Sequence, residues 1–304
     1  MSAREISGFS SLRPWTRAAA RAALTAVALS MSGCFSTPTP LAPGVAGSVG
    51  VPHDGVLTGG VMLPVRGQGF VRYRPRSSYY WGVERLVRAV QSAARAVEHD
   101  FPGTPPLVLG DLSAERGGKI PKHNSHRTGR DIDLLWYVTT PGGAPVVNPG
   151  FVRIESDALA VVPGGGGYVR LDVARQWALI RHLLASTDIE VQWMFCSKPV
   201  EALLIDHARA RGEPAELVWH AETVLLQPGD SLPHDDHIHL RVACSPAEAV
   251  AGCLGGGPRW EWLSPLPRHP EGDDLLYAYA QADPFAVSPD DPRVVTHDRP
   301  DGEL

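Results

Sequence analysis

The sequence contains few cysteines, and no two of the four have the Cys-x-x-Cys spacing that a thiolate zinc site uses. It has no Ser-x-x-Lys, Gly-x-Ser-x-Gly or His-Glu-x-x-His motif, which excludes penicillin-binding serine enzymes, nucleophile-elbow hydrolases and helical zinc proteases. The net charge of -5 gives no basic patch for nucleic acid. With 304 residues, 31 glycines and 28 prolines, we expect a loop-rich globular chain of one large or two small domains.

The first 34 residues have the pattern of a targeting segment. Several arginines precede the apolar run 22–31, which is too short to span a bilayer as a helix and leads into Ser32-Gly33-Cys34. This pattern resembles a bacterial lipoprotein signal, which implies cleavage at Cys34 and lipidation of that cysteine; the alternative is an ordinary secretory peptide. Phe35 after the cysteine favours the outer membrane, so we expect a periplasmic protein that meets the membrane only through an N-terminal lipid anchor.

Composition divides the rest of the chain into three segments. Residues 35–50 are rich in threonine, proline, alanine and glycine and are expected to be a flexible tether. Residues 51–257 carry the periodic apolar patterns of a folded domain, and residues 258–304 form an extension rich in proline and aspartate.

Three cysteines lie within the expected folded domain, in an oxidising compartment. Cys244 and Cys253 flank a turn-prone segment and could form a disulfide, although only the geometry can decide this pairing. Cys196 would then remain as a buried free thiol.

Helical and strand-like patterns alternate along the folded domain. Apolar residues at helical spacing predict helices over 79–99, 171–185, 198–211 and 215–226. Short apolar or alternating runs predict strands over 107–109, 131–138, 189–195 and the histidine-rich run that begins at residue 234. We therefore expect an α+β domain in which helices flank a small, largely antiparallel sheet that carries the functional site.

The residues with the richest chemistry fall into two clusters. The run 234–241 reads His-Asp-Asp-His-Ile-His-Leu-Arg, and a strand there would place His237 and His239 on one face. The other cluster lies upstream, in residues 123–133, and contributes His126 and Asp133. Two imidazoles and one carboxylate, from His126, Asp133 and His239, leave one position for water, which is the ligand count of a catalytic zinc site rather than a structural one.

Both clusters together resemble the penicillin-insensitive murein endopeptidases. The resemblance is carried by Ser125-His126-x-x-Gly129-x-Asp131-x-Asp133 and by His234-Asp235-Asp236-His237-x-His239-x-Arg241. These enzymes belong to a wider zinc metallopeptidase group with the pattern His-x6-Asp followed by His-x-His, which includes lysostaphin-like enzymes, D-Ala-D-Ala peptidases and the hedgehog domain. The resemblance covers roughly residues 51–257.

The resemblance implies a role for each of these histidines. His126, Asp133 and His239 would bind zinc, His237 would be the general base beside the attacking water, and His234 would be a further active-site histidine. The substrate would be the peptide stems of peptidoglycan, cut between D-Ala and meso-diaminopimelate. Two alternatives stay open: a D-Ala-D-Ala carboxypeptidase or dipeptidase of the same fold, and a zinc-stabilised envelope binding protein without catalysis.

Other polar residues in the motifs each have two interpretations. His123 either lines the site, where it could touch a second metal, or is an exposed loop residue. Asp131 either orients a ligand imidazole or caps a loop. Arg241 either binds a substrate carboxylate or forms a surface salt bridge. Asp235 and Asp236 either set the entry into the strand or are partners of the neighbouring histidines.

Overall fold

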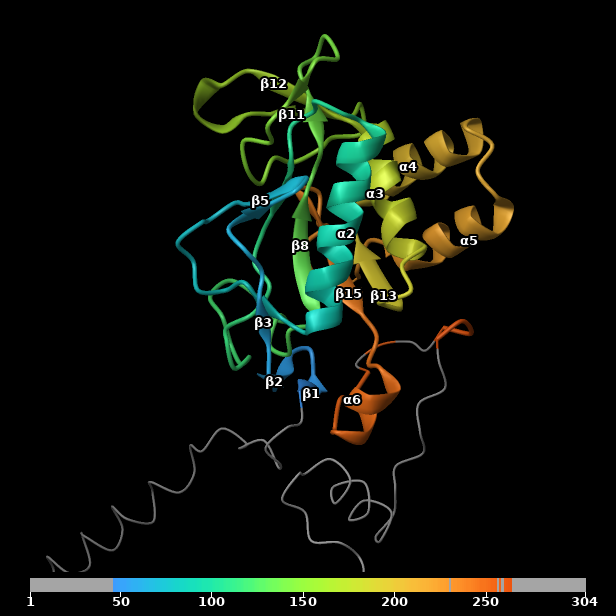
Figure 1. Cartoon of the computed structure of the whole chain (residues 1–304). Coiled ribbons are helices and arrows are strands. Elements are labelled where there is room, and N and C mark those ends of the chain that lie inside the picture. The colour runs from blue at the N-terminus through green and yellow to red at the C-terminus, as the bar shows by residue number, and fades with distance from the viewer. Residues whose placement is uncertain (1–45, 230, 256, 258–259, 264–304) are drawn as a thin grey trace, which may run out of the picture. The chain divides into compact units, whose positions relative to one another are not determined.

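The computed structural model describes residues 46–229, 231–255, 257 and 260–263 (Figure 1). The expected signal segment with Cys34, most of the tether and most of the C-terminal extension lie outside these residues. Among the helices that are described, none combines the length and the apolar character needed to cross a bilayer.

The main sheet consists of seven strands. They are β4 (Arg66–Gly67), β5 (Phe70–Arg72), β7 (Leu107–Leu109), β8 (Asp131–Leu135), β13 (Val191–Phe195), β14 (Leu225–Leu226) and β15 (His237–Val242). Their order across the sheet is β14-β13-β15-β8-β7-β5-β4. The pairs β13–β14 and β5–β7 are parallel, and the remaining neighbours are antiparallel. The predicted α+β class with a largely antiparallel sheet is confirmed.

Smaller sheets surround the main one. They are formed by β1 (Gly47–Val51) with β2 (Asp54–Thr58), by β3 (Val61–Met62) with β6 (Trp81–Gly82), and by β9 (Val138–Thr139), β10 (Pro145–Val146), β11 (Leu159–Val161) and β12 (Tyr168–Leu171). A 3-10 turn, η1 (Pro163–Gly165), lies between β11 and β12.

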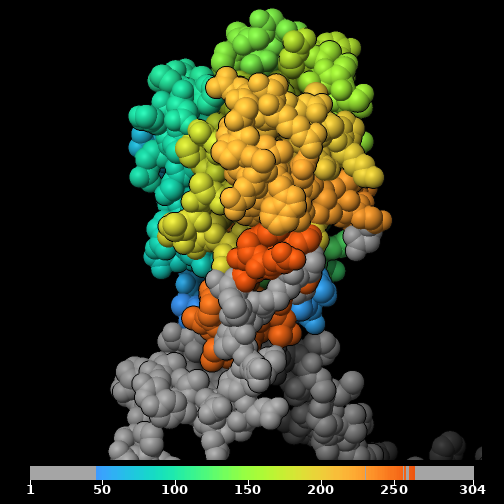
Figure 2. Space-filling model, turned by 90° about the vertical axis from the view of Figure 1, so that its right-hand side faces the viewer, coloured from blue at the N-terminus to red at the C-terminus, as the bar shows by residue number. Residues whose placement is uncertain are grey.

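Four α-helices of the described part correspond to predicted ones: α2 (Glu84–Asp100), α3 (Val173–Leu184), α4 (Lys198–Ala210) and α5 (Ala215–Val224). The short α6 (Pro246–Val250) was not predicted. Figure 1 shows α2 to α5 gathered on one side of the main sheet, and Figure 2 shows α4 and α5 at the surface of that side. Because side chains alternate along a strand, Ile238 and Leu240 of β15 face the same core as these helices. His237, His239 and Arg241 therefore lie on the opposite face of the sheet.

Several boundaries differ from the predictions for identifiable reasons. The helix expected from residue 79 begins at Glu84, because Trp81 and Gly82 pair with β3 and Trp81 also bridges to Ser113. The helix expected to reach residue 226 ends at Val224, because the next two residues join the sheet beside β13. Residues 47–50, expected in the tether, form the first part of β1, and residues 234–236 precede the strand expected to include them.

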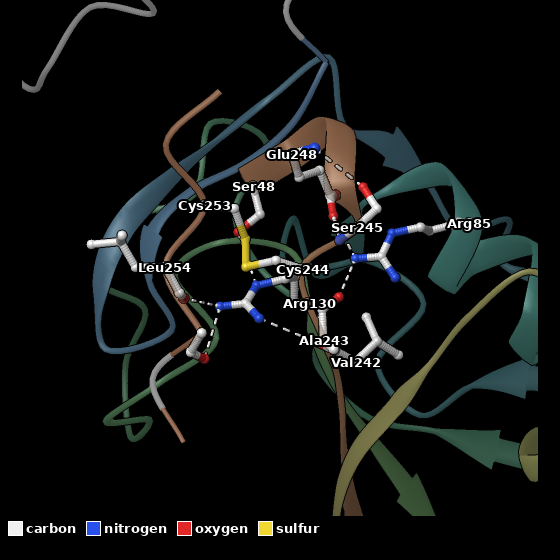
Figure 3. The surroundings of a disulfide bond; sticks show 11 residues. Ser48, Arg85, Arg130, Val242, Ala243, Cys244, Ser245, Glu248, Cys253 and Leu254 are labelled. Carbon is white, nitrogen blue, oxygen red and sulfur yellow. Dashed lines mark hydrogen bonds and ion pairs between the residues drawn. A yellow bond between two sulfur atoms is a disulfide. The ribbon is translucent and has the colours of Figure 1, made fainter. Parts of the chain in front are cut away.

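A disulfide joins Cys244 and Cys253, as the sequence suggested, and Cys196 is a buried free thiol. The loop that the disulfide closes contains α6 and pairs with β1: the Gly50 amide donates to the Gly252 carbonyl at 2.8 Å. Figure 3 shows the buried Arg130 beside the disulfide. The Arg130 guanidinium donates to the Ser48 hydroxyl and to the carbonyls of Val242 and Leu254, so that it ties β1, β15 and the disulfide loop together.

The β1–β2 hairpin also supports the loop that carries the first histidine cluster. The Arg127 amide donates to the Pro52 carbonyl at 3.2 Å, and the Gly118 amide donates to the Gly55 carbonyl at 3.2 Å. Gly117 is held so close to Val56 and Leu57 that a side chain could not be added there without a shift of the backbone. The hairpin thus supports the loop of the first histidine cluster, while Arg130 and the disulfide loop hold the hairpin against β15.

Candidate metal centre

His126, Asp133 and His239 lie together on the face of the main sheet that is opposite the helices. His239 and Asp133 are direct neighbours across the β15–β8 pair, and His126 enters from the preceding loop with a φ of 62°. His126 Nε2 lies 3.2 Å from Asp133 Oδ1 and 3.3 Å from His239 Nδ1, and the third side, from His239 Nδ1 to Asp133 Oδ1, is 3.4 Å. The three atoms form a nearly equilateral triangle among side chains that are almost fully buried.

The hydrogen bonds behind the two imidazoles fix where their lone pairs point. His126 Nδ1 lies 2.6 Å from the Leu112 carbonyl, and His239 Nε2 lies 2.9 Å from Asp131 Oδ1. Because a carbonyl and a carboxylate oxygen only accept hydrogen bonds, these ring nitrogens are the donors. The lone pairs of His126 Nε2 and His239 Nδ1 therefore face each other and Asp133, an arrangement that calls for a cation between them.

The Asp133 carboxylate likewise lacks a partner that a cation would supply. Both of its oxygens are buried without a hydrogen-bond partner in the described part of the chain. Four ligands at about 2.0–2.1 Å from a tetrahedral ion lie about 3.4 Å from one another, which matches the spacing within the triangle. The donor set and its geometry thus fit a small tetrahedral metal ion such as zinc, with one position left open.

His237 lies at the open side of the triangle. Its Nε2 is 3.3 Å from Asp133 Oδ1, and its Nδ1 is held by Asp236 Oδ1 at 2.5 Å. Burial lowers the pKa of His237, but the charge of Asp133, together with the charge and hydrogen bond of Asp236, outweighs burial and raises this pKa to about 10. A cation bound to Asp133 would offset part of that increase.

His234 is a further histidine at the site. Its ring centroid is 5.2 Å from that of His237 and 5.5 Å from that of His239, and its Nδ1 lies 2.8 Å from the Leu232 carbonyl. Burial, followed by the neighbouring His239 and His237, lowers the pKa of His234 to about 4. This histidine is therefore neutral near pH 7.

Comparison with known proteins identifies the family. A family model described as penicillin-insensitive murein endopeptidase matches residues 48–255. The chain belongs to this family. Among its relatives, proteins named penicillin-insensitive murein endopeptidase from Escherichia coli O1:K1 / APEC and from Escherichia coli strain SMS-3-5 / SECEC are each 27% identical to it over 237 residues. That alignment covers 75% of this chain and 78% of each relative. The predicted family is confirmed.

Asp131 and Arg241 form a buried pair behind the triangle. Arg241 Nε donates to Asp131 Oδ1 at 2.6 Å, and the same oxygen accepts from His239. Asp131 Oδ2 accepts from the backbone amide of His126, so one carboxylate touches both histidines of the triangle. Burial acts to raise the pKa of Asp131, but the charge of Arg241 and the His239 contact hold it far below its usual range. Arg241 is only 8% exposed, which leaves little of its guanidinium accessible to a substrate.

His123 also faces the centre, although at longer range. Its Nδ1 is 3.9 Å from Asp133 Oδ2, and its ring lies 4.3 Å from that of His126. His123 Nε2 lies 3.4 Å from Oδ2 of Asp111, a buried residue two positions after the end of β7. The sequence analysis did not assign Asp111 to the site, although Gly110-Asp111 follows a buried apolar strand and also resembles the approach to the site in the murein endopeptidases.

Two aromatic side chains border the histidines. The Phe151 ring lies edge to face with His237, at 5.4 Å between centroids, and Phe195 of β13 lies 5.7 Å from His239 and 5.6 Å from His234. Neither was predicted, because the two phenylalanines come from segments without a polar motif. They border the polar centre with apolar surface.

Proposed function

We propose that this chain is a zinc-dependent endopeptidase that hydrolyses the peptide cross-links of murein, between D-Ala and meso-diaminopimelate. Family membership supports murein as the substrate. The observation that carries the metal dependence is the triangle of His126, Asp133 and His239, in which two lone pairs and a carboxylate converge without a hydrogen-bond donor. These three residues would hold the ion. When bound, zinc polarises a carbonyl group and lowers the pKa of a water molecule.

The remaining residues would handle protons and orientation. His237 Nε2 would accept the proton of the attacking water and return it to the leaving amine, because this nitrogen faces the open side of the triangle. Asp236 holds Nδ1 and thereby fixes the ring for this exchange. His234, neutral and adjacent, would contact the substrate from the other side of His237. Asp131 would keep His239 in the tautomer that presents Nδ1 to the ion.

We further infer that the protein acts in the periplasm, where murein lies, with Cys34 as the lipid attachment point. The disulfide between Cys244 and Cys253 agrees with an oxidising compartment. A net charge of -5 gives no reason to expect a nucleic-acid partner. Acylation of Cys34 is tested by mass spectrometry of the N-terminal peptide after expression in a double-membraned bacterium, with Cys34→Ser as the control.

The function is tested with the purified full chain on murein sacculi, with and without a chelator, followed by separation of the products by mass. We expect cross-linked dimers to become monomers, chelation to stop the reaction, and stoichiometric zinc to restore it. Loss of terminal D-Ala alone would instead establish a carboxypeptidase. No change in the murein, despite one bound zinc per chain, would overturn the peptidase proposal for this substrate, and binding to murein would then be measured instead.

A further inference from the structure

Arg74, which none of the motifs contains, is an exposed arginine that is linked to the metal centre through Asp111. It follows β5, and its Nη1 donates to Asp111 Oδ2 at 3.1 Å, while its side chain remains 48% exposed. Within the described part of the chain, Nε and Nη2 of Arg74 make no hydrogen bond, so the guanidinium has donors to offer. We propose that Arg74 is the anchor of a subsite that binds a free carboxylate of the substrate.

Two separate sets of contacts connect this segment to the metal centre. Asp111, the partner of Arg74, also approaches His123, which in turn faces Asp133. The preceding residue, Tyr73, packs edge to face on Phe151 at 5.3 Å between centroids, and Phe151 packs on His237. Tyr73 and Arg74 are thus linked to opposite sides of the centre, one through His237 and the other through His123. A substrate held at the centre would lie within reach of this segment.

The charges around the centre create a need for such a cation. Asp111, Asp131, Asp133 and Asp236 all lie at or directly behind it, and Arg241 balances only Asp131. A substrate carboxylate that approaches from the side of Asp111 therefore needs a cation within its reach. Murein stem peptides carry free carboxyl groups on residues next to their cross-links. Arg241 cannot serve them, because it is buried and its Nε is bonded to Asp131.

The geometry of the Arg74 contact suits this task. A guanidinium presents its donors in a planar fork that matches a carboxylate, and engagement of one edge leaves another free. Asp111 holds Nη1 and so fixes the orientation of the side chain before a ligand arrives, which reduces the entropy lost on binding. The chemical class of the ligand is therefore a carboxylate on the peptide stem, and this inference rests on the proposed function.

The test compares two substrates and four proteins. The substrates are a cross-linked murein peptide dimer and the same dimer with its free carboxyl groups converted to carboxamides. The proteins are the full-length wild type, Arg74→Gln, Arg74→Lys, and Arg76→Gln as a matched control at an exposed arginine two residues further along. Bound zinc and the melting temperature of each variant are measured first, so that loss of the fold or of the metal is seen directly.

We expect Arg74→Gln to lower kcat/KM on the acid dimer about 10- to 100-fold, mainly through KM, and to change cleavage of the amide dimer little. The wild type should prefer the acid dimer by a similar factor, Arg74→Lys should recover part of the loss, and Arg76→Gln should behave as wild type. Equal losses on both substrates, or a wild type indifferent to amidation, would show that Arg74 only supports Asp111 and would overturn the inference. A wild type that cleaves neither substrate would instead overturn the proposed function, and this inference with it.

Discussion

Replacement of Asp131 by asparagine is expected to weaken metal binding without touching a proposed metal ligand. The Asp131 carboxylate accepts hydrogen bonds from the His239 ring, the Arg241 guanidinium and the His126 backbone amide. Asparagine has nearly the same shape but carries no charge. Its side-chain nitrogen is a hydrogen-bond donor, so it cannot accept a hydrogen bond from any of these three groups. The hydrogen bonds that orient both histidines of the triangle are therefore weakened.

Two magnitudes follow from this geometry. Loss of an outer partner of a metal-binding histidine usually costs about 10- to 100-fold in metal affinity. Independently, Arg241 would remain 8% exposed without its carboxylate, and an uncompensated buried charge costs about 3–5 kcal/mol of stability. The double variant Asp131→Asn/Arg241→Gln removes that charge as well. It should therefore recover much of the stability while its zinc affinity stays low.

Zinc affinity is measured by competition with a chromophoric chelator, and stability by urea unfolding of the zinc-free protein. Asp206→Asn, at an exposed position of α4, is the matched control and should leave both quantities unchanged. If Asp131→Asn binds zinc as tightly as the wild type, orientation of His239 by Asp131 does not matter for the metal. If the double variant is no more stable than the single one, the unpaired Arg241 is not the source of the loss.

Three further predictions concern the support of the site and the proton exchange. Removal of the disulfide by Cys244→Ser/Cys253→Ser should lower the free energy of unfolding by about 2–3 kcal/mol, as expected for so short a loop. Urea unfolding measures this quantity, and an unchanged value would contradict the prediction. Arg130→Met should cost about 3 kcal/mol or more in the same assay, because the Ser48 hydroxyl and the carbonyls of Val242 and Leu254 lose their donor. A smaller loss than that of the disulfide variant would contradict this. His237→Gln should keep bound zinc and lower kcat about 100-fold or more, and Asp236→Asn should lower it less; full activity of the former would rule out His237 as the base.

The sequence was informative where a local pattern determines the structure. The alternation from His237 to Arg241 correctly predicted which side chains share one face of β15, because the strand period is strictly two. Leu107–Leu109 was predicted to the residue, since a short apolar run between turn residues has few other solutions. The pairing of Cys244 with Cys253 was one of the options that the sequence left open, and their Cα separation of 5.9 Å allows it.

What the sequence could not provide is pairing between distant segments. The register that places His239 opposite Asp133 joins strands about a hundred residues apart, and no local pattern determines it. Trp81 continues the apolar spacing of the following helix, yet its pairing with Met62 draws it into a strand. Asp111 reaches the centre only because β7 runs beside β8, so its role depends on sheet order rather than on a motif.

The strongest argument for a metal is the way in which charge is balanced across the site. Asp131 has Arg241, and Asp111 has Arg74, so each of these carboxylates has a permanent cation beside it. Within the described part of the chain, every ion-pair contact of Asp133 is with a histidine. A protonated His237 places one positive charge beside Asp133, but it leaves the facing lone pairs of His126 and His239 without a partner. A divalent cation satisfies the carboxylate and the two facing lone pairs at once, which no arrangement of protons does.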